Sequence, residues 1–143
     1  MTLTPEQVVR TFCANVSTRD LSTIEPLLAD DVVFMNVGLE IYRGKQAVLD
    51  HFGPDGVWDM FPDTFEFRIR NLGASENRVY TERVDVVGAN GYDAPLPLLG
   101  IFEVDNGKIK QWRDYSDMTM VRRLLQGEKL SAEEGFPPGT EDV

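Results

Sequence analysis

The chain has 143 residues, of which 42% are hydrophobic and 27% charged, the proportions of a globular domain with a buried core. Fourteen basic and twenty-four acidic residues give a formal net charge of −10, which repels nucleic acids and anionic membranes. The sequence has no apolar run of about 18 residues and no signal-peptide pattern. We therefore expect a cytoplasmic protein that has neither nucleic acid nor membrane as a partner, and whose ligand is a neutral small molecule.

The first half of the chain predicts helices around one strand. Thr4, followed by Pro5 and then by Gln7, is typical of a helix start with a capping box. Further helical patterns cover Asp20–Leu28 and Lys45–Phe52. The single cysteine, Cys13, excludes an internal disulfide and is interpreted as a buried thiol, and no Cys/His cluster is spaced for a metal. The only histidine, His51, is interpreted as a capping or surface side chain, because no acid or nucleophile accompanies it in sequence.

Between these helices, Val32–Val37 predicts a strand with Val32, Phe34 and Asn36 on one face. Asn36 is the one amide among apolar neighbours. From the residues alone, the favoured interpretation is an amide that satisfies the backbone of a loop.

The second half of the chain predicts antiparallel strands. The expected strands lie at Phe65–Ile69, Val79–Val87, Leu98–Val104 and Lys108–Asp117, with a proline-containing loop over Gly88–Pro97 and a last helix from Met118 to about Gly127. Helices followed by such strands predict an α+β fold in which a curved sheet packs on helices. We expect one domain over residues 1–130 and a tail with little structure over 131–143.

Asn106-Gly107 is a strong hairpin signal and fixes an expected register. A two-residue turn with regular pairing places Ile101 opposite Trp112 and Leu99 opposite Asp114. In that register Asp114 lies on an apolar wall, and Phe102, Val104 and Ile109 fill the opposite face of the sheet.

Three charged side chains stand out on these strands. Arg83 and Asp85 share one face of their strand with valines, and Asp114 lies on another strand among apolar residues. If the three converge, the arginine fork can hold both carboxylates, which then share one proton and supply an acid and a base. Such a pair can open a strained ring with water. An ion network that only ties two strands together explains the same spacing, and the residues alone leave both readings open.

The strands that carry these residues resemble the limonene-1,2-epoxide hydrolase family. The likeness is sharpest over residues 80–117, in Arg-x-Asp at 83–85 and Trp-Arg-Asp-Tyr at 112–115, and extends weakly over residues 5–125. It implies a cone-shaped α+β fold with a curved mixed or antiparallel sheet (NTF2-like, SnoaL-like, cystatin-like α+β roll). It also implies a homodimer that needs no metal or organic cofactor.

The resemblance also assigns roles. Asp114 resembles the base that deprotonates a water, Asp85 the acid that protonates the epoxide oxygen, and Arg83 the bridge between them. Asn36 aligns with a water-holding asparagine, against its interpretation from the residues alone. The expected reaction adds water directly to an apolar epoxide and gives a vicinal diol without a covalent intermediate.

The sequence departs from the family pattern at two positions. Phe34 replaces a tyrosine that touches the water in the limonene enzyme, and Ser116 replaces a phenylalanine. The side chains expected to line the pocket are Phe34, Trp58, Leu99, Ile101, Trp112 and Ser116. Two other functions stay open, an epoxide-opening cyclase of polyether or polyketide-type biosynthesis and a non-catalytic ligand-binding module of the same fold.

Overall fold

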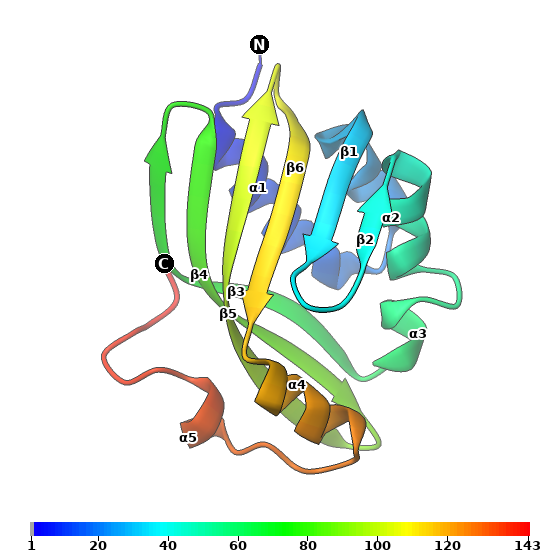
Figure 1. Cartoon of the computed structure of the whole chain (residues 1–143), viewed down its shortest axis with the longest axis vertical. Coiled ribbons are helices and arrows are strands. Elements are labelled where there is room, and N and C mark those ends of the chain that lie inside the picture. The colour runs from blue at the N-terminus through cyan, green and yellow to red at the C-terminus, as the bar shows by residue number, and fades with distance from the viewer. Residues whose placement is uncertain (1) are drawn as a thin grey trace.

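The computed structural model describes residues 2–143, which form one six-stranded sheet with helices against it (Figure 1). The strand order is β2-β1-β6-β5-β4-β3, and β1 is parallel to β6 while all other neighbours are antiparallel. The strands are β1 (Leu28–Asn36), β2 (Ile41–Arg43), β3 (Thr64–Ser75), β4 (Arg78–Ala89), β5 (Tyr92–Asp105) and β6 (Lys108–Ser116). This mixed, curved sheet packed on helices confirms the α+β class predicted from the sequence.

The helices are α1 (Pro5–Asn15), α2 (Lys45–Phe52), α3 (Val57–Met60), α4 (Met118–Leu125) and α5 (Ala132–Gly135). As the sequence predicts, Thr4 caps α1: its hydroxyl accepts from the Gln7 backbone, and the Gln7 side chain accepts from the Thr4 backbone. The helical pattern predicted at Asp20–Leu28, in which Pro26 argued against one continuous helix, does not form an α-helix. That segment forms the 3₁₀ turns η2 (Leu21–Thr23) and η3 (Glu25–Leu27), after a first turn η1 (Val16–Thr18), because Pro26 interrupts α-helical hydrogen bonding.

The long strands β3, β4 and β5 bend at mid-length, so the sheet encloses a concave face (Figure 1). In that view α1 lies behind the upper half of the sheet and α4 lies across its lower half. Phe12 of α1 is fully buried, with ring centroids 5.1 Å from Trp112 and 6.0 Å from Phe102. Burying such a ring contributes about 1.5–3 kcal/mol, so the upper half of the concave face is the core. Within residues 2–143, no helix has the length and apolar character to cross a membrane.

The Asn106-Gly107 hairpin is confirmed, with both residues at positive φ (50° and 74°), but the register expected beyond it is wrong by one residue. Val104 pairs with Ile109, whereas Glu103 pairs with Gln111, so Lys110 is an extra residue in a β-bulge. Phe102 therefore lies opposite Trp112, and Gly100 opposite Asp114. Since a shift of one residue reverses the face, the even-numbered residues of β5 from Leu98 to Val104 point inward, and Leu99 and Ile101 point outward.

The loop expected over Gly88–Pro97 is instead the end of β4, a turn at Asn90-Gly91 and the start of β5. Pro95 and Pro97 pair with β4, but β6 ends at Ser116 opposite Leu98. This part of β5 therefore has a strand on one side only, and a proline is tolerated there because one row of backbone donors is not needed by a neighbour.

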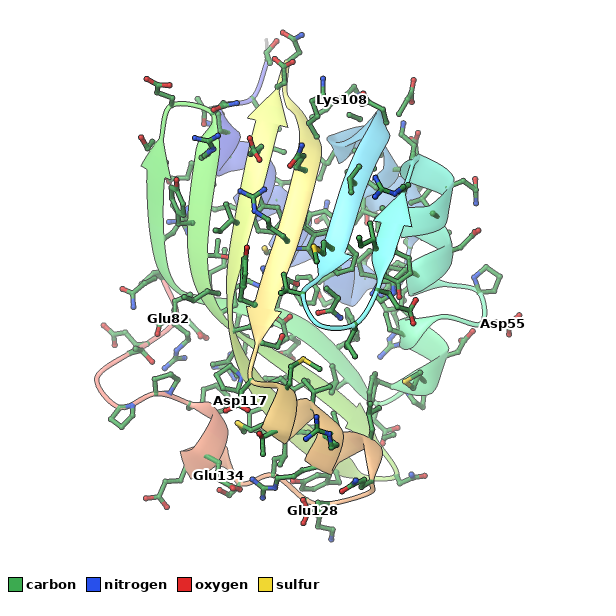
Figure 2. All side chains as sticks on the ribbon, in the orientation of Figure 1. Asp55, Glu82, Lys108, Asp117, Glu128 and Glu134 are labelled. Carbon is green, nitrogen blue, oxygen red and sulfur yellow. The ribbon has the colours of Figure 1, made fainter. Side chains whose placement is uncertain are left out.

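The tail has more structure than the sequence indicates. A capping box of Ser131 and Glu134 starts α5, and Arg123 of α4 pairs with Glu134 and Glu128, which Figure 2 shows at the lower end of the molecule. The last residues then lie along β3, where Asp142 pairs with Arg68 (2.8 Å) and Arg70 (2.7 Å). The backbone N–H of Val143 donates to the Ile69 carbonyl (2.9 Å), so the tail covers part of an edge strand.

Candidate active site

Arg83 is the centre of the site, and its side chain is fully buried on the concave face of β4. Its Nε and Nη2 donate to the two oxygens of Asp85 (both 3.0 Å). Its Nη1 and Nη2 donate to Oδ1 and Oδ2 of Asp114 (3.2 and 3.0 Å), and Nη1 also donates to the hydroxyl of Thr81 (3.3 Å). These contacts use all five donors of the guanidinium, so its plane and its position are fixed.

The guanidinium of Arg83 is closely packed by its neighbours. The guanidinium carbon lies 4.5 Å from the centroid of the Phe67 ring and 5.7 Å from that of Phe102. On the neighbouring strand, a β-carbon added to Gly100 would lie 2.2 Å from Nη1 of Arg83 and 2.7 Å from Oδ1 of Asp114. Thr81, which accepts from Arg83, donates to the Gly100 carbonyl (2.9 Å). Glycine at position 100 is thus the condition for the close approach of β5 to the ion cluster.

Asp114 lies near the C-terminal end of β6 and is buried, with 4% of its surface exposed. Its Oδ1 accepts from the indole Nε1 of Trp112 (2.8 Å) as well as from Arg83, whereas its Oδ2 accepts from Arg83 alone. The Trp112 ring thus engages one oxygen and leaves Oδ2 with the more available lone pair. Of the two oxygens, Oδ2 is therefore the better placed to accept a proton from a water molecule.

Asp85 is held by the same arginine, and burial shifts its protonation equilibrium. Burial raises the pKa of Asp85 from 3.8 to about 6, against the attraction of Arg83, which lowers it, and the nearby Asp114 raises it further. One guanidinium and two carboxylates carry a net charge of −1, and one proton on Asp85 makes the buried cluster neutral. Because an uncompensated buried charge is costly, the pair favours one acid and one base.

A cavity of about 320 Å³ opens beside these groups on the concave face. Asp85 and Asp114 reach its wall, together with four of the predicted side chains, Phe34, Asn36, Trp112 and Ser116. Asn36 is the last residue of β1 and lies directly opposite Asp114 in the parallel β1–β6 pair. Of the four predicted catalytic residues, Asp85, Asp114 and Asn36 thus line this cavity, and Arg83 lies behind its wall, bonded to both aspartates.

Three predicted pocket residues lie elsewhere. Leu99 and Ile101 are on the convex face of the sheet because of the bulge at Lys110, and Leu99 is 56% exposed. Trp58 is buried in the core, where its ring packs on Phe52 at the end of α2 and its Nε1 donates to the Val16 carbonyl (2.9 Å). Sequence spacing did not distinguish an apolar residue of the core from one of the cavity wall.

Other residues of the cavity wall were not predicted from the sequence. His51 lies on it and is partly buried, so its interpretation as a capping or surface side chain is wrong. Tyr42 and Glu40 are also on the wall, and Phe34 stacks between the rings of Tyr42 (5.4 Å) and Trp112 (3.7 Å). The pairing of β2 with β1 brings Tyr42 and Phe34 together, and the short Gly-containing loop between them was the available signal. The interpretation of Cys13 is confirmed: it is buried, and burial raises the pKa of its thiol to about 12.

The arrangement suits proton transfer at a small organic ligand. A buried acid and a buried base lie on the two sides of one guanidinium, and the apolar remainder of the wall comes from α3, α4 and the lower parts of β3, β4 and β5. Across residues 2–143, no three His, Cys, Asp or Glu side chains are grouped so as to hold a metal ion.

Comparison with known proteins gives one consistent result. Residues 3–126 match the model of the limonene-1,2-epoxide hydrolase catalytic domain. Epoxide hydrolase EphG of Mycobacterium tuberculosis is 34% identical over 122 residues, which are 83% of this chain and 78% of that protein. The solved structure of an M. tuberculosis LEH-like epoxide hydrolase is similar with a TM-score of 0.72 and 31% identity, covering 86% of this chain and 90% of that one.

The fold is shared more widely. The solved structure of a SnoaL-like protein from Shewanella putrefaciens has a TM-score of 0.72, with 87% of this chain and 97% of that one covered. At 14% identity this likeness concerns the fold alone.

The geometry around Gly100 generates a prediction. Replacing Gly100 by Ala must displace Arg83 or Asp114, and we expect activity to fall about 100-fold and the free energy of unfolding to fall by about 1–3 kcal/mol. Denaturant unfolding and steady-state kinetics measure the two effects. Gly73→Ala is the matched control, because a β-carbon there has no neighbour within 4 Å. Equal behaviour of the two variants would show that the approach of Gly100 to Arg83 is unimportant.

Proposed function

The chain belongs to the limonene-1,2-epoxide hydrolase family, and we propose that it adds an activated water directly to a largely apolar epoxide to give a vicinal diol. The observation that carries this proposal is that the Arg83 guanidinium makes two hydrogen bonds to each of Asp85 and Asp114 and so holds both beside one cavity. Four functional residues follow, with Asp114 as base, Asp85 as acid, Arg83 as bridge and Asn36 as a water ligand. The reaction as proposed uses these protein groups and water, with no metal or organic cofactor.

In the proposed reaction a water lies between Asn36 and Oδ2 of Asp114. Asp114 removes a proton as the water oxygen bonds to one epoxide carbon, while the bond from that carbon to the epoxide oxygen breaks. Asp85 gives its proton to the departing oxygen, so the diol forms in one step and one proton has moved from Asp85 to Asp114. Each proton-transfer role contributes about 10²–10⁴-fold in rate.

Phe34 favours a second candidate within this chemistry. Its ring lies on the cavity wall between Trp112 and Tyr42, and it has no group that can hydrogen-bond a water. A site with fewer water ligands suits a hydroxyl of the substrate as the nucleophile, as in an epoxide-opening cyclase. The third possibility, a non-catalytic module, requires the buried cluster to be structural only.

An epoxide panel with product analysis tests these functions. We expect vicinal diols from the wild-type protein and a loss of at least about 100-fold in Asp85→Asn and Asp114→Asn, because each variant lacks one proton-transfer group. Glu103→Gln is the matched control, since Glu103 pairs with Arg113 (2.8 Å) away from the site. Cyclic ethers as products would identify the cyclase, and wild-type activity in either Asp variant would exclude the roles assigned here.

The same reaction in ¹⁸O-labelled water tests the single step. In one turnover the label is expected in the diol at once and never in an aspartate. Label that enters the protein first would establish a covalent ester and contradict the direct attack of water.

The raised pKa of Asp85 predicts a pH dependence. Above about pH 6 Asp85 loses the proton it must donate, so kcat/KM is expected to fall up to tenfold per pH unit. Because the folded-state pKa exceeds the ordinary value, the contribution of protonated Asp85 to the free energy of unfolding is complete below pH 3.8 and disappears as the pH rises through about 6. In Asp85→Asn the free energy of unfolding should lack this pH dependence, because an asparagine side chain does not titrate. A kcat/KM that stays constant from pH 6 to pH 9 would contradict the proposal.

We also propose a homodimer formed by the convex face of the sheet. Leu99, Tyr80 and Tyr115 are 56%, 43% and 47% exposed, and they line one depression with Leu72 and Ile101. Exposed apolar groups in such a cluster support a protein contact. Light scattering after gel filtration is expected to give a dimer for the wild type and a folded monomer for Leu99→Lys. Leu3→Lys, at an exposed residue outside this cluster, is the control, and a dimeric Leu99→Lys would place the contact elsewhere.

A further inference from the structure

The cavity wall also carries polar side chains two strands away from Asp114, and the proposed reaction does not use them. His51, Tyr42 and Glu40 lie there on the same cavity wall as Asp85 and Asp114. His51 also borders a surface depression with Asp50, Asp55 and Met60.

The ring of His51 is held in place by aromatic neighbours. Its centroid lies 4.6 Å from that of Tyr42, 5.3 Å from that of Phe34 and 5.4 Å from that of Phe52. Of these three neighbours only Tyr42 carries a polar group, its hydroxyl, and within residues 2–143 no hydrogen bond joins that hydroxyl to His51. A side chain fixed in this way loses little conformational entropy when it binds a ligand.

Both nitrogens of His51 are available. Within residues 2–143, no hydrogen bond affects the pKa of His51; burial lowers it to about 4, and Glu40 only partly opposes this. The described part of the chain also holds no fully buried side-chain nitrogen or oxygen that lacks a partner, so the His51 nitrogens are accessible from the cavity or from the surface depression beside it. At neutral pH this ring is uncharged, with one donor and one acceptor.

The sheet fixes how far this group lies from the reacting centre. Asn36 of β1 lies opposite Asp114, and Tyr42 of β2 lies opposite Phe34, so Tyr42 is two strands away from Asp114. Adjacent strands are about 4.8 Å apart and two residues along a strand span about 6.6 Å, which places the Tyr42 backbone roughly 10–12 Å from that of Asp114. The His51 ring packs against the Tyr42 ring.

We propose that His51 is a specificity-determining residue that binds a neutral hydroxyl or carbonyl group carried roughly 10 Å from the epoxide. The inference rests on the proposed epoxide hydrolysis and narrows its substrate class to epoxides with an apolar middle and a polar far end. The acidic residues at this end, Glu40, Asp50 and Asp55, disfavour a carboxylate at the same position.

Matched substrates test the proposal. The substrates are 1,2-epoxyoctane, 7,8-epoxyoctan-1-ol and 7,8-epoxyoctanoate, which share one chain and differ at its far end. For the wild type, kcat/KM for the alcohol is expected to exceed that for the plain epoxide by about five- to tenfold, mainly through KM. The carboxylate is expected to be the poorest of the three.

Two variants assign the preference to His51. In His51→Phe the ratio of kcat/KM for the alcohol to kcat/KM for the plain epoxide should fall to about one, because an aromatic ring remains but both nitrogens are lost. His51→Gln, which retains a donor and an acceptor, should keep part of the preference. A wild-type ratio near one, a ratio that survives in His51→Phe, or a preference for the carboxylate would overturn the proposal.

These measurements test the role of His51 separately from the proposed hydrolysis. Turnover of 1,2-epoxyoctane reports hydrolysis, and the ratio of substrates reports His51. If neither neutral epoxide is hydrolysed, the proposed function fails. Calorimetric binding of 1,2-octanediol and 1,2,8-octanetriol to wild type and His51→Phe then decides the inference, with equal affinities in the wild type counting against it.

Discussion

The structure depends on one buried guanidinium. Arg83 has no exposed surface, and a buried arginine is tolerated only when its charge and its five donors are satisfied. Asp85, Asp114 and Thr81 satisfy them, and each comes from a defined strand position. The same contacts that make Arg83 acceptable in the interior hold the two carboxyl groups at the wall of a cavity. Stability and chemistry therefore place the same demands on these residues.

The strands around Arg83 are shaped to admit it. The bulge at Lys110 shifts β6 by one residue against β5, so that Trp112, Asp114 and Ser116 face inward together with Ile109. Without the extra residue, Ile109 and Asp114 would point to opposite faces. Gly100 then provides the space beside Asp114, since any side chain there would overlap the cluster. A local irregularity and a missing side chain are thus both conditions for the ion cluster.

The cavity wall carries two sets of polar side chains. Asp85, Asp114 and Asn36 are the groups proposed for proton transfer and water binding, and His51 and Tyr42, from α2 and β2, add uncharged polar groups to the same wall. The aromatic stack of Trp112, Phe34 and Tyr42 connects the two sets across three strands. The tail, which lies beyond the matched residues 3–126, is anchored to β3 by Asp142 and to α4 by Glu134, so it supports the helix that closes the cavity.

The sequence by itself determined the features that follow from local periodicity. The faces of β4, the capped start of α1 and the Asn106-Gly107 turn were predicted correctly, because each depends on residues within one or two turns of chain. The residue spacing allowed Arg83 to lie between the two aspartates but did not require it, and the family motifs favoured that arrangement. Only the tertiary structure decided the inward direction of Asp114 relative to Leu99, the placement of Trp58 in the core and of His51 on the cavity wall, and the docking of the tail. These features depend on a β-bulge and on packing between residues far apart in sequence, and the local sequence pattern contains no information about such contacts.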